Sequence, residues 1–217
     1  MNRLQIKICG IANLADARVC VDLGADMIGL NFYPRSPRYI QPERAREIVE
    51  NIPRRVRAIG VFVDPTAGEV RSIAKATGVE CVQLHGSLSP ETCRELASKL
   101  RVIRAFSTTA QFHPEDAGAF PDCDILLDAE HPNLRGGTGF TCDWSAARAT
   151  LPFARFLILS GGLNAQNVGE AITAVVPHAV DVCSGVESIP GVKDRRAIEK
   201  FIAAARMAEG STADQAV

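Results

Sequence analysis

The sequence lacks an excess of charge of either sign and has no long apolar run. Its 24 lysines and arginines nearly balance 25 aspartates and glutamates, so the net charge is −1 over 217 residues. Without a basic surplus, the composition gives no electrostatic argument for binding nucleic acid or an anionic membrane surface. No apolar stretch reaches the roughly 20 residues that a membrane-spanning helix needs. We therefore expect neither nucleic acid nor a membrane as a partner.

Closely spaced cysteine pairs are also missing. The seven cysteines stand at positions 9, 20, 81, 93, 123, 142 and 183, and no two of them are two or three residues apart. Zinc sites and disulfide frameworks normally show such short spacings or an even count. We expect no metal, no disulfide framework, and a reducing, cytoplasmic setting that keeps the thiols free. Because Lys7 interrupts the apolar start of the chain, we expect no secretory signal.

What the sequence does contain is a regular alternation of short apolar runs and helix signals. The expected strands are 4–9, 26–32, 56–63, 80–85, 102–106, 124–128, 156–160 and 179–184. Eight strand–helix units in a chain of this length predict a parallel (β/α)8 TIM barrel, an α/β fold. We expect one catalytic domain over residues 1–208 and a frayed, small and polar tail over residues 209–217.

Capping residues mark where the expected helices begin. Asn13 precedes the first helix, and Ser89-Pro90 and Asp64-Pro65 each place a capping residue before a proline. Asn164 is the expected cap of the helix that follows strand 156–160. The helical pattern is weak over 110–119, and the last helix is expected from about residue 193 to 207.

Side-chain alternation favours a barrel over an open doubly wound sheet, which would also alternate strands with helices. In the first strand, Ile6 and Ile8 share one face while Lys7 and Cys9 share the other. An aliphatic face suits packing against helices, and a partly polar face suits a lumen that opens into an active-site mouth. The last strand places Asp181 on its polar face. Since the first and last strands adjoin in a closed barrel, we predict a buried Lys7–Asp181 ion pair.

Two acid–base candidates lie where strands end. Cys9 ends the first strand, although a small buried apolar residue would look the same. Asp128 closes the sixth strand, and the next helix starts too far downstream for Asp128 to be its cap. Strands one and six are three steps apart around an eight-membered ring. The two side chains would therefore face each other across the mouth, an arrangement that can move a proton between two parts of a substrate.

Other strand ends offer groups that could bind a substrate. Gly161 and Gly162 follow the seventh strand, and Ser184 and Gly185 follow the eighth, where barrels often bind phosphate through backbone N–H groups. Tight turns alone would also explain these glycines. Arg38, in the loop after the second strand, could bind a carboxylate with its planar guanidinium or be a solvated surface arginine.

Strand 80–85 and the longest loop complete the candidate mouth. Gln83 and His85 lie at the end of that strand, and His85 could be an acid–base group or a hydrogen-bonded wall residue, which we favour. The glycine-rich segment 136–139 lacks the lysine of a nucleotide-binding loop. Its glycine content suggests a mobile lid over the mouth.

Several of these segments together closely resemble the phosphoribosylanthranilate isomerase family. They are Lys7-Ile8-Cys9-Gly10-Ile11, Tyr33-Pro34-Arg35-Ser36-Pro37-Arg38-Tyr39, Gln83-Leu84-His85-Gly86, Leu126-Leu127-Asp128, Gly136-Gly137-Thr138-Gly139, Leu159-Ser160-Gly161-Gly162-Leu163 and Ser184-Gly185-Val186-Glu187. Each is weak alone, but they run in the family's order over nearly the whole chain. The resemblance implies an isomerase of tryptophan biosynthesis that converts N-(5-phosphoribosyl)anthranilate to 1-(2-carboxyphenylamino)-1-deoxyribulose 5-phosphate. This Amadori rearrangement needs no cofactor.

The resemblance also assigns roles. It implies that Cys9 is the general base, Asp128 the general acid and Arg38 the ligand of the anthranilate carboxylate. It also implies that the backbone of Gly161, Gly162, Ser184 and Gly185 holds the phosphate. From their position at the mouth, we expect Gln83 and His85 to contact the substrate as well. Cys183 departs from the family, which usually has serine there. A side chain facing the mouth at this position could remove one phosphate contact.

Two other functions compete with this interpretation. A related isomerase of the histidine pathway uses paired carboxylates at the ends of strands one and five, where this chain has Cys9 and Phe106-Ser107. A non-catalytic barrel that binds a phosphate ligand could keep the glycine loops but would not need Cys9 and Asp128 together. We expect a small phosphoribosyl substrate as the partner and a monomeric protein.

Overall fold

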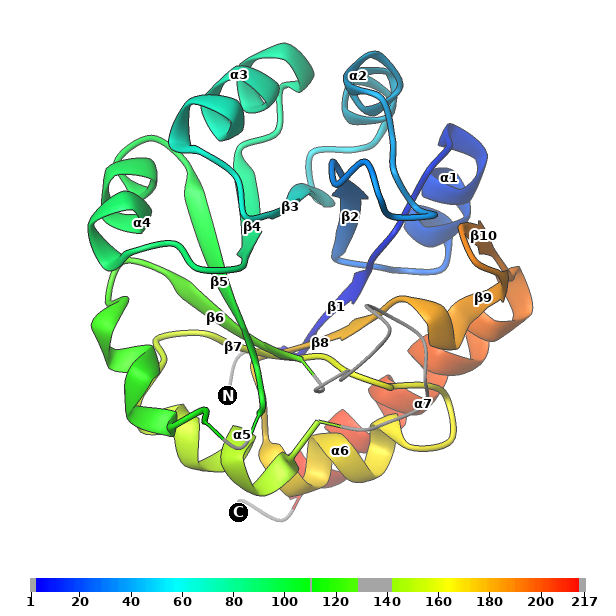
Figure 1. Cartoon of the computed structure of the whole chain (residues 1–217). Coiled ribbons are helices and arrows are strands. Elements are labelled where there is room, and N and C mark those ends of the chain that lie inside the picture. The colour runs from blue at the N-terminus through cyan, green and yellow to red at the C-terminus, as the bar shows by residue number, and fades with distance from the viewer. Residues whose placement is uncertain (1–2, 110, 129–141, 215–217) are drawn as a thin grey trace.

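The computed structural model describes residues 3–109, 111–128 and 142–214. Within these ranges, parallel strands close into an eight-stranded barrel in which each pairs with the next and the last pairs with the first (Figure 1). The strands are β1 (Gln5–Ile8), β2 (Met27–Asn31), β3 (Arg57–Val63), β4 (Cys81–His85), β5 (Arg101–Ser107), β6 (Asp124–Asp128), β7 (Leu157–Leu159) and β8 (Ala179–Val182). The expected TIM barrel is confirmed.

Helices surround the barrel on its outside (Figure 1). They are α1 (Leu14–Asp22), α2 (Pro42–Asn51), α3 (Ala67–Thr77), α4 (Pro90–Ala97), α5 (Trp144–Thr150), α6 (Val168–Val175) and α7 (Arg195–Asp214). Short 3-10 helices are η1 (Pro114–Ala119), η2 (Leu151–Phe153) and η3 (Ser184–Val186), and a hairpin of β9 (Glu187–Ile189) and β10 (Val192–Lys193) follows η3. The weak helical pattern over 110–119 thus corresponds to the 3-10 helix η1.

Helix caps explain most of the observed helix starts. The side chain of Asn13 accepts a hydrogen bond from the backbone N–H of Asp16 at 2.8 Å, and Ser89 caps α4, so both predictions are confirmed. The predicted cap of α3 is wrong, because Thr66 caps that helix in a reciprocal capping box with Glu69. Asp64 instead adopts a positive φ of 48° and turns toward the end of β4.

The cap of α6 also differs from the prediction. Asn167 occupies the N-cap position, whereas Asn164 lies one turn earlier and accepts hydrogen bonds from the N–H groups of Gln166 and Asn167. Asn164 therefore forms a local Asx turn, which competes with helix formation and delays the start of α6.

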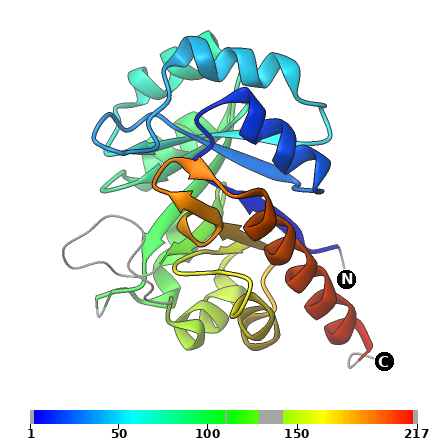
Figure 2. The ribbon, with the colours of Figure 1, turned by 90° about the vertical axis from the view of Figure 1, so that its right-hand side faces the viewer.

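The last helix differs from the expectation at both ends. Lys193 belongs to β10, because its main chain pairs with β9 before α7 begins. The helix continues to Asp214 instead of fraying from residue 209. Glu209 stabilises this extension by accepting a hydrogen bond from the backbone N–H of Leu4 at 2.6 Å. Figure 2 shows the start of β1 and the end of α7 at the same side of the molecule.

Two apolar layers and one polar layer account for the core. One layer packs the outward faces of the strands against the helices, as Ile6 and Ile8 do. A second fills the lumen and consists of Met27, Ile59, Cys81, Ile103, Ala105, Leu126, Ile158 and Ala179. Toward the carboxyl ends of the strands the lumen becomes polar. There Lys7 donates to Asp181 at 2.9 Å, with both side chains buried, which confirms the predicted ion pair.

Candidate active site

Cys9 lies one residue beyond β1, at the carboxyl end of the barrel. Its N–H donates to the carbonyl of Val182 at 2.8 Å, so the pairing of β1 with β8 continues to this residue. The side chain is on the same face as Lys7 and therefore points into the lumen. A Cβ on Gly29 of the neighbouring β2 would lie 2.7 Å from the Cys9 sulfur. Only glycine at position 29 leaves room for the thiol.

The surroundings of Cys9 favour the thiolate. The largest influence is a hydrogen bond with the Cys183 thiol, which lowers the pKa of Cys9. Burial acts in the opposite direction, while the positive charges of Lys7 and, more weakly, Lys193 favour ionisation. The net effect lowers the pKa of Cys9 to about 7. The same hydrogen bond, together with burial, raises the pKa of Cys183, which therefore stays protonated.

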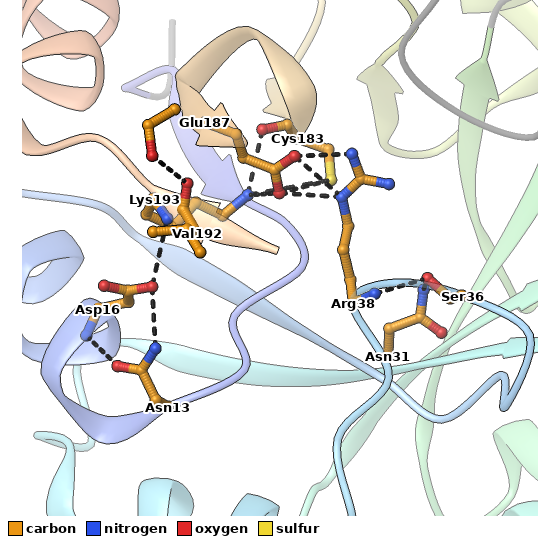
Figure 3. Close-up of polar contacts among 10 residues, drawn as sticks. Asn13, Asp16, Asn31, Ser36, Arg38, Cys183, Glu187, Val192 and Lys193 are labelled. Carbon is orange, nitrogen blue, oxygen red and sulfur yellow. Dashed lines mark hydrogen bonds and ion pairs between the residues drawn. The ribbon is translucent and has the colours of Figure 1, made fainter. Parts of the chain in front are cut away.

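A cluster of charged side chains lies beside Cys183 (Figure 3). Arg38 donates from Nε and Nη2 to the carboxylate of Glu187 at 2.9 and 2.7 Å. Lys193 donates to the same carboxylate at 2.8 Å and to the carbonyl of Cys183 at 3.1 Å. Glu187 thus joins the loop after β2 to the hairpin after β8. A Cβ on Gly10, which has φ +77°, would lie 2.7 Å from the Arg38 side chain, so this approach requires glycine.

Opposite charges hold this cluster in its ionised form. Burial alone would raise the pKa of Glu187, but Arg38 and Lys193 hold it below its usual value. The hydrogen bonds to Glu187 keep the pKa of Arg38 above its ordinary value despite burial. Arg38 is therefore a buried, oriented guanidinium, and the alternative of a solvated surface arginine is wrong.

Asp128 is the last residue of β6 and pairs in register with Ser107 of β5. Its carbonyl accepts hydrogen bonds from the N–H and the hydroxyl of Thr108, at 2.9 and 3.0 Å, which fixes the strand end. The side chain is half-buried and shares its strand face with Leu126, a lumen residue. Asp128 and Cys9 therefore both lie on lumen-facing positions, on strands three steps apart in the ring.

The two glycine-containing loops are in direct contact. A Cβ on Gly185 would lie 2.1 Å from the carbonyl oxygen of Leu163, so the loop after β8 packs against the loop after β7. Gly161 and Gly162 have φ of +88° and +64°, and the side chain of Asn167 donates to the carbonyl of Gly162 at 3.0 Å. The expected juxtaposition of these loops is thus present at the mouth.

Gln83 and His85 extend from β4 on its lumen face. The amide nitrogen of Gln83 lies 2.6 Å from Nε2 of His85. Within the described ranges, Oε1 of Gln83 has no hydrogen-bond partner although it is buried. The pair therefore presents an acceptor inside the barrel, and the contact fits the expectation that His85 is a hydrogen-bonded wall residue.

Glu187 and Lys193 were not among the predicted site residues. Glu187 belongs to a motif in the sequence, but nothing in the strand pattern indicated that it would reach Arg38. The sequence pattern predicts Lys193 at the start of the last helix, where a lysine side chain is normally solvated, so it gave no reason to expect Lys193 in the site. The predicted lid, 136–139, lies outside the described residues. Over the residues described, no three His, Cys, Asp or Glu side chains cluster as metal ligands, and no helix is long and apolar enough to cross a membrane.

A closed parallel barrel with a thiol, a carboxylate and glycine loops at the carboxyl ends of its strands defines an enzyme of the TIM-barrel class. A family model described as N-(5'phosphoribosyl)anthranilate (PRA) isomerase matches residues 6–204. The chain therefore belongs to the N-(5'-phosphoribosyl)anthranilate isomerase family.

Individual relatives agree with this assignment. The N-(5'-phosphoribosyl)anthranilate isomerase of Thermotoga maritima is 44% identical over 199 residues, which are 92% of this chain and 97% of the relative. The crystal structure of the Thermotoga maritima enzyme superposes with a TM-score of 0.89 at 43% identity, covering 94% of this chain and all of that one. A phosphoribosyl anthranilate isomerase in complex with reduced 1-(o-carboxyphenylamino)-1-deoxyribulose 5-phosphate superposes with a TM-score of 0.85 at 41% identity, covering 94% and 100% of the two chains.

Proposed function

We propose that Cys9 and Asp128 are the general base and the general acid of this isomerase. Its reaction is the conversion of N-(5'-phosphoribosyl)anthranilate to 1-(2-carboxyphenylamino)-1-deoxyribulose 5-phosphate in tryptophan biosynthesis. This Amadori rearrangement turns an aminoaldose into an aminoketose within one molecule. Only protons have to move between the protein and the substrate, so one base and one acid on opposite sides of the sugar suffice.

The two groups act in sequence. Asp128 protonates the ring oxygen of the ribose, and the ring opens to a Schiff base. Cys9 then removes the proton from C2′, which gives an enolamine that tautomerises to the ketone. The observation that supports this assignment best is the lumen-facing thiol of Cys9 with its pKa near 7, next to Lys7 and Cys183. A thiol with a lowered pKa is ionised to a larger extent at neutral pH than an ordinary cysteine, of which only a few per cent is thiolate.

Arg38 is the proposed ligand of the anthranilate carboxylate. Glu187 occupies the edge of the guanidinium formed by Nε and Nη2. Among the described residues, no other side chain bonds the second edge, formed by Nη1 and Nη2, which could make a bidentate contact with a substrate carboxylate. Glu187 therefore orients Arg38 and does not block it. Gln83 and His85 would contact the substrate from β4.

The phosphate of the substrate is assigned to the seam between the loops after β7 and β8. Gly161 and Gly162 donate no backbone hydrogen bond to an acceptor among the described residues. Ser184 and Gly185 begin η3, where the first N–H groups of a helix lack partners within the helix. Four N–H groups at one seam suit an anion with several oxygens.

The cellular compartment and the oligomeric state of the protein are further parts of the proposal. We propose a monomer whose catalytic domain spans residues 1–208. Seven free cysteines fit a reducing cytoplasm. Sedimentation of the purified protein tests the monomer directly.

Fluorescence of the anthranilate group gives the decisive assay. Synthetic N-(5'-phosphoribosyl)anthranilate is added, and its fluorescence loss is followed for the wild type and for Cys9→Ala and Asp128→Ala. Each variant should lose turnover by about 10²- to 10⁴-fold, as expected when a general base or acid is removed. Binding of a phosphate analogue should survive in both. Near-normal turnover in either variant would remove that residue from its role.

A further inference from the structure

Two cysteines from neighbouring strands meet at the mouth. In the pairing of β1 with β8, Lys7 lies opposite Asp181 and Ile8 opposite Val182. The hydrogen bond from the Cys9 N–H to the Val182 carbonyl continues this ladder, so the next residues in register are Cys9 and Cys183. They lie two residues beyond an ion pair whose side chains already meet inside the lumen, and therefore point to the same side.

The spacing of this pair suits a disulfide bond. Neighbouring strands lie about 4.8 Å apart, and disulfides join residues whose Cα atoms are about 4.4 to 6.8 Å apart. Each thiol also shifts the pKa of the other, down for Cys9 and up for Cys183, which fits sulfurs that lie close together. A Cβ on Gly10, the residue after Cys9, would lie 3.0 Å from the Cys183 sulfur, which places that sulfur directly beside the β1 chain end. A bond between the sulfurs therefore requires little backbone movement.

The two thiols differ in reactivity. Cys9 is the thiol with the lowered pKa, to which the charges of Lys7 and Lys193 contribute, so it supplies the nucleophilic thiolate. Cys183 keeps its proton, and its sulfur lies 4.0 Å from both the Glu187 carboxylate and the Lys193 ammonium. Cys183 is partly exposed, and Cys9 is buried with 9% of its surface accessible, so a small oxidant can reach the pair from the side of Cys183.

A second thiol pair provides a comparison within the same chain. Cys93 of α4 and Cys123 likewise shift each other's pKa, beside the buried Arg104. Both are almost fully buried between the barrel and its helices, with exposures of 0% and 2%. An inaccessible thiol reacts slowly even when its pKa is lowered, so this pair tests whether access or proximity decides the outcome.

We propose that Cys9 and Cys183 are an oxidisable dithiol that hydroperoxides convert to a reversible disulfide across the β1–β8 seam. Formation of the disulfide does not depend on what Cys9 does in the reaction, whereas the accompanying loss of activity rests on the proposed catalytic role of Cys9. Oxidation removes the thiolate from the mouth. The bond also protects Cys9 from irreversible oxidation to the sulfinic acid.

The reaction balances with a hydroperoxide as the oxidant. The Cys9 thiolate attacks one peroxide oxygen, the O–O bond breaks, and the leaving oxygen takes up a proton as water or an alcohol. Cys9 is then a sulfenic acid. The Cys183 sulfur attacks the Cys9 sulfur, the S–O bond breaks, and hydroxide leaves as water with the thiol proton. Two thiols lose two electrons and two protons, and a dithiol reductant restores both by thiol–disulfide exchange.

Mass spectrometry of the full-length protein tests the bond itself. The protein is treated with hydrogen peroxide at low molar excess, its remaining thiols are alkylated, and it is digested without reduction. We expect a cross-linked peptide pair containing Cys9 and Cys183, lighter by two hydrogens than the two peptides together. Alkylated or sulfinic Cys9 without any such cross-link, or a cross-link of Cys93 and Cys123 alone, would overturn the proposal.

Variants separate the disulfide from other effects of the oxidant. Wild-type protein should lose nearly all activity in peroxide and regain it with dithiothreitol. Cys183→Ser should also be inactivated but should not recover, because Cys9 lacks a resolving thiol and proceeds to the sulfinic acid. Cys123→Ser, which breaks the second pair, should recover like the wild type. Full recovery of Cys183→Ser would contradict the proposal.

Failure of the proposed function gives a different result. If Cys9 were not the base, the Cys9→Ala variant would turn over normally, yet the Cys9–Cys183 cross-link would still form in the wild type. If the dithiol proposal were wrong, Cys9→Ala would be inactive and the cross-link would be absent.

Discussion

Lys7 and Asp181 form a buried ion pair 2.9 Å long at the seam where the first and last strands close the barrel. The hydroxyl of Ser160 also donates to Asp181 at 3.4 Å. Burial would lower the pKa of Lys7, but Asp181 and Cys9 outweigh it, so the pKa is raised and the lysine stays charged. The pair thus keeps a positive charge directly below the Cys9 thiol.

Breaking this pair should destabilise the protein strongly. Lys7→Met leaves a buried carboxylate without its cation, which should cost about 3 to 5 kcal/mol in the free energy of unfolding. The double variant Lys7→Met/Asp181→Leu should recover much of that loss, since a buried pair is often replaceable by apolar residues. Urea unfolding at neutral pH measures both. As a control, Glu50→Gln breaks the exposed Arg46–Glu50 pair and should change stability by under about 1 kcal/mol.

The acidic side of the pH–rate profile should report the Cys9 thiol. The base must be deprotonated, so kcat/KM should fall about tenfold per pH unit below the pKa near 7. Cys183→Ala removes the hydrogen-bond donor, so the pKa of Cys9 should rise and the acidic limb should move to higher pH. Cys183→Ser keeps a donor and should move the limb much less. Identical profiles for alanine, serine and wild type would show that Cys183 does not tune Cys9.

The contact between Arg38 and Glu187 should affect substrate affinity more than turnover. Arg38→Ala should raise KM by roughly 10- to 100-fold, the equivalent of a lost charged hydrogen bond. Arg38→Lys should recover only part of this, because an ammonium cannot contact two oxygens in a plane. Glu187→Gln should also raise KM, since it loosens the orientation of Arg38. A fall in kcat with unchanged KM in these variants would argue against a carboxylate-binding role for Arg38.

The contact between the two glycine loops should be essential for phosphate binding. Gly185→Ala would place a methyl group 2.1 Å from the Leu163 carbonyl oxygen, so the loops must move apart. Affinity for a sugar phosphate, measured by calorimetry, should drop by about tenfold or more, in line with the 1 to 3 kcal/mol typical of overpacking. Gly68→Ala is the matched control, because the nearest atom to its added methyl lies at 3.9 Å. Equal affinities in both variants would locate the phosphate elsewhere.

Much of the barrel could be predicted from local pattern. Alternation along strands is a short-range property, so the side of Lys7, Cys9 and Asp181 followed from their positions alone. Closure of an eight-stranded ring places the first strand beside the last. The inward-facing Lys7 and Asp181 could therefore be predicted to meet, and they lie opposite each other in the pairing of β1 with β8.

Contacts that depend on loop paths could not be predicted in this way. The hairpin β9–β10 follows no helix or strand period of the barrel, yet its path brings Glu187 into contact with both Arg38 and Lys193. Asp64 was mistaken for a helix cap because its neighbour Pro65 is typical of a helix start, while the turn of the chain directs Asp64 toward the N–H of Ser87. In each case the long-range partner overrides the local signal.

Closure of the barrel also determines on which side of the molecule a tag or a fusion partner joined to the chain would lie. Leu4 enters β1 at its amino end, and the terminal helix returns there, with Arg206 donating to the Leu4 carbonyl and Glu209 accepting from its N–H. Both ends of the described chain therefore lie on the floor of the barrel, opposite the mouth. An affinity tag or a fused enzyme joined at either terminus would leave substrate entry unobstructed.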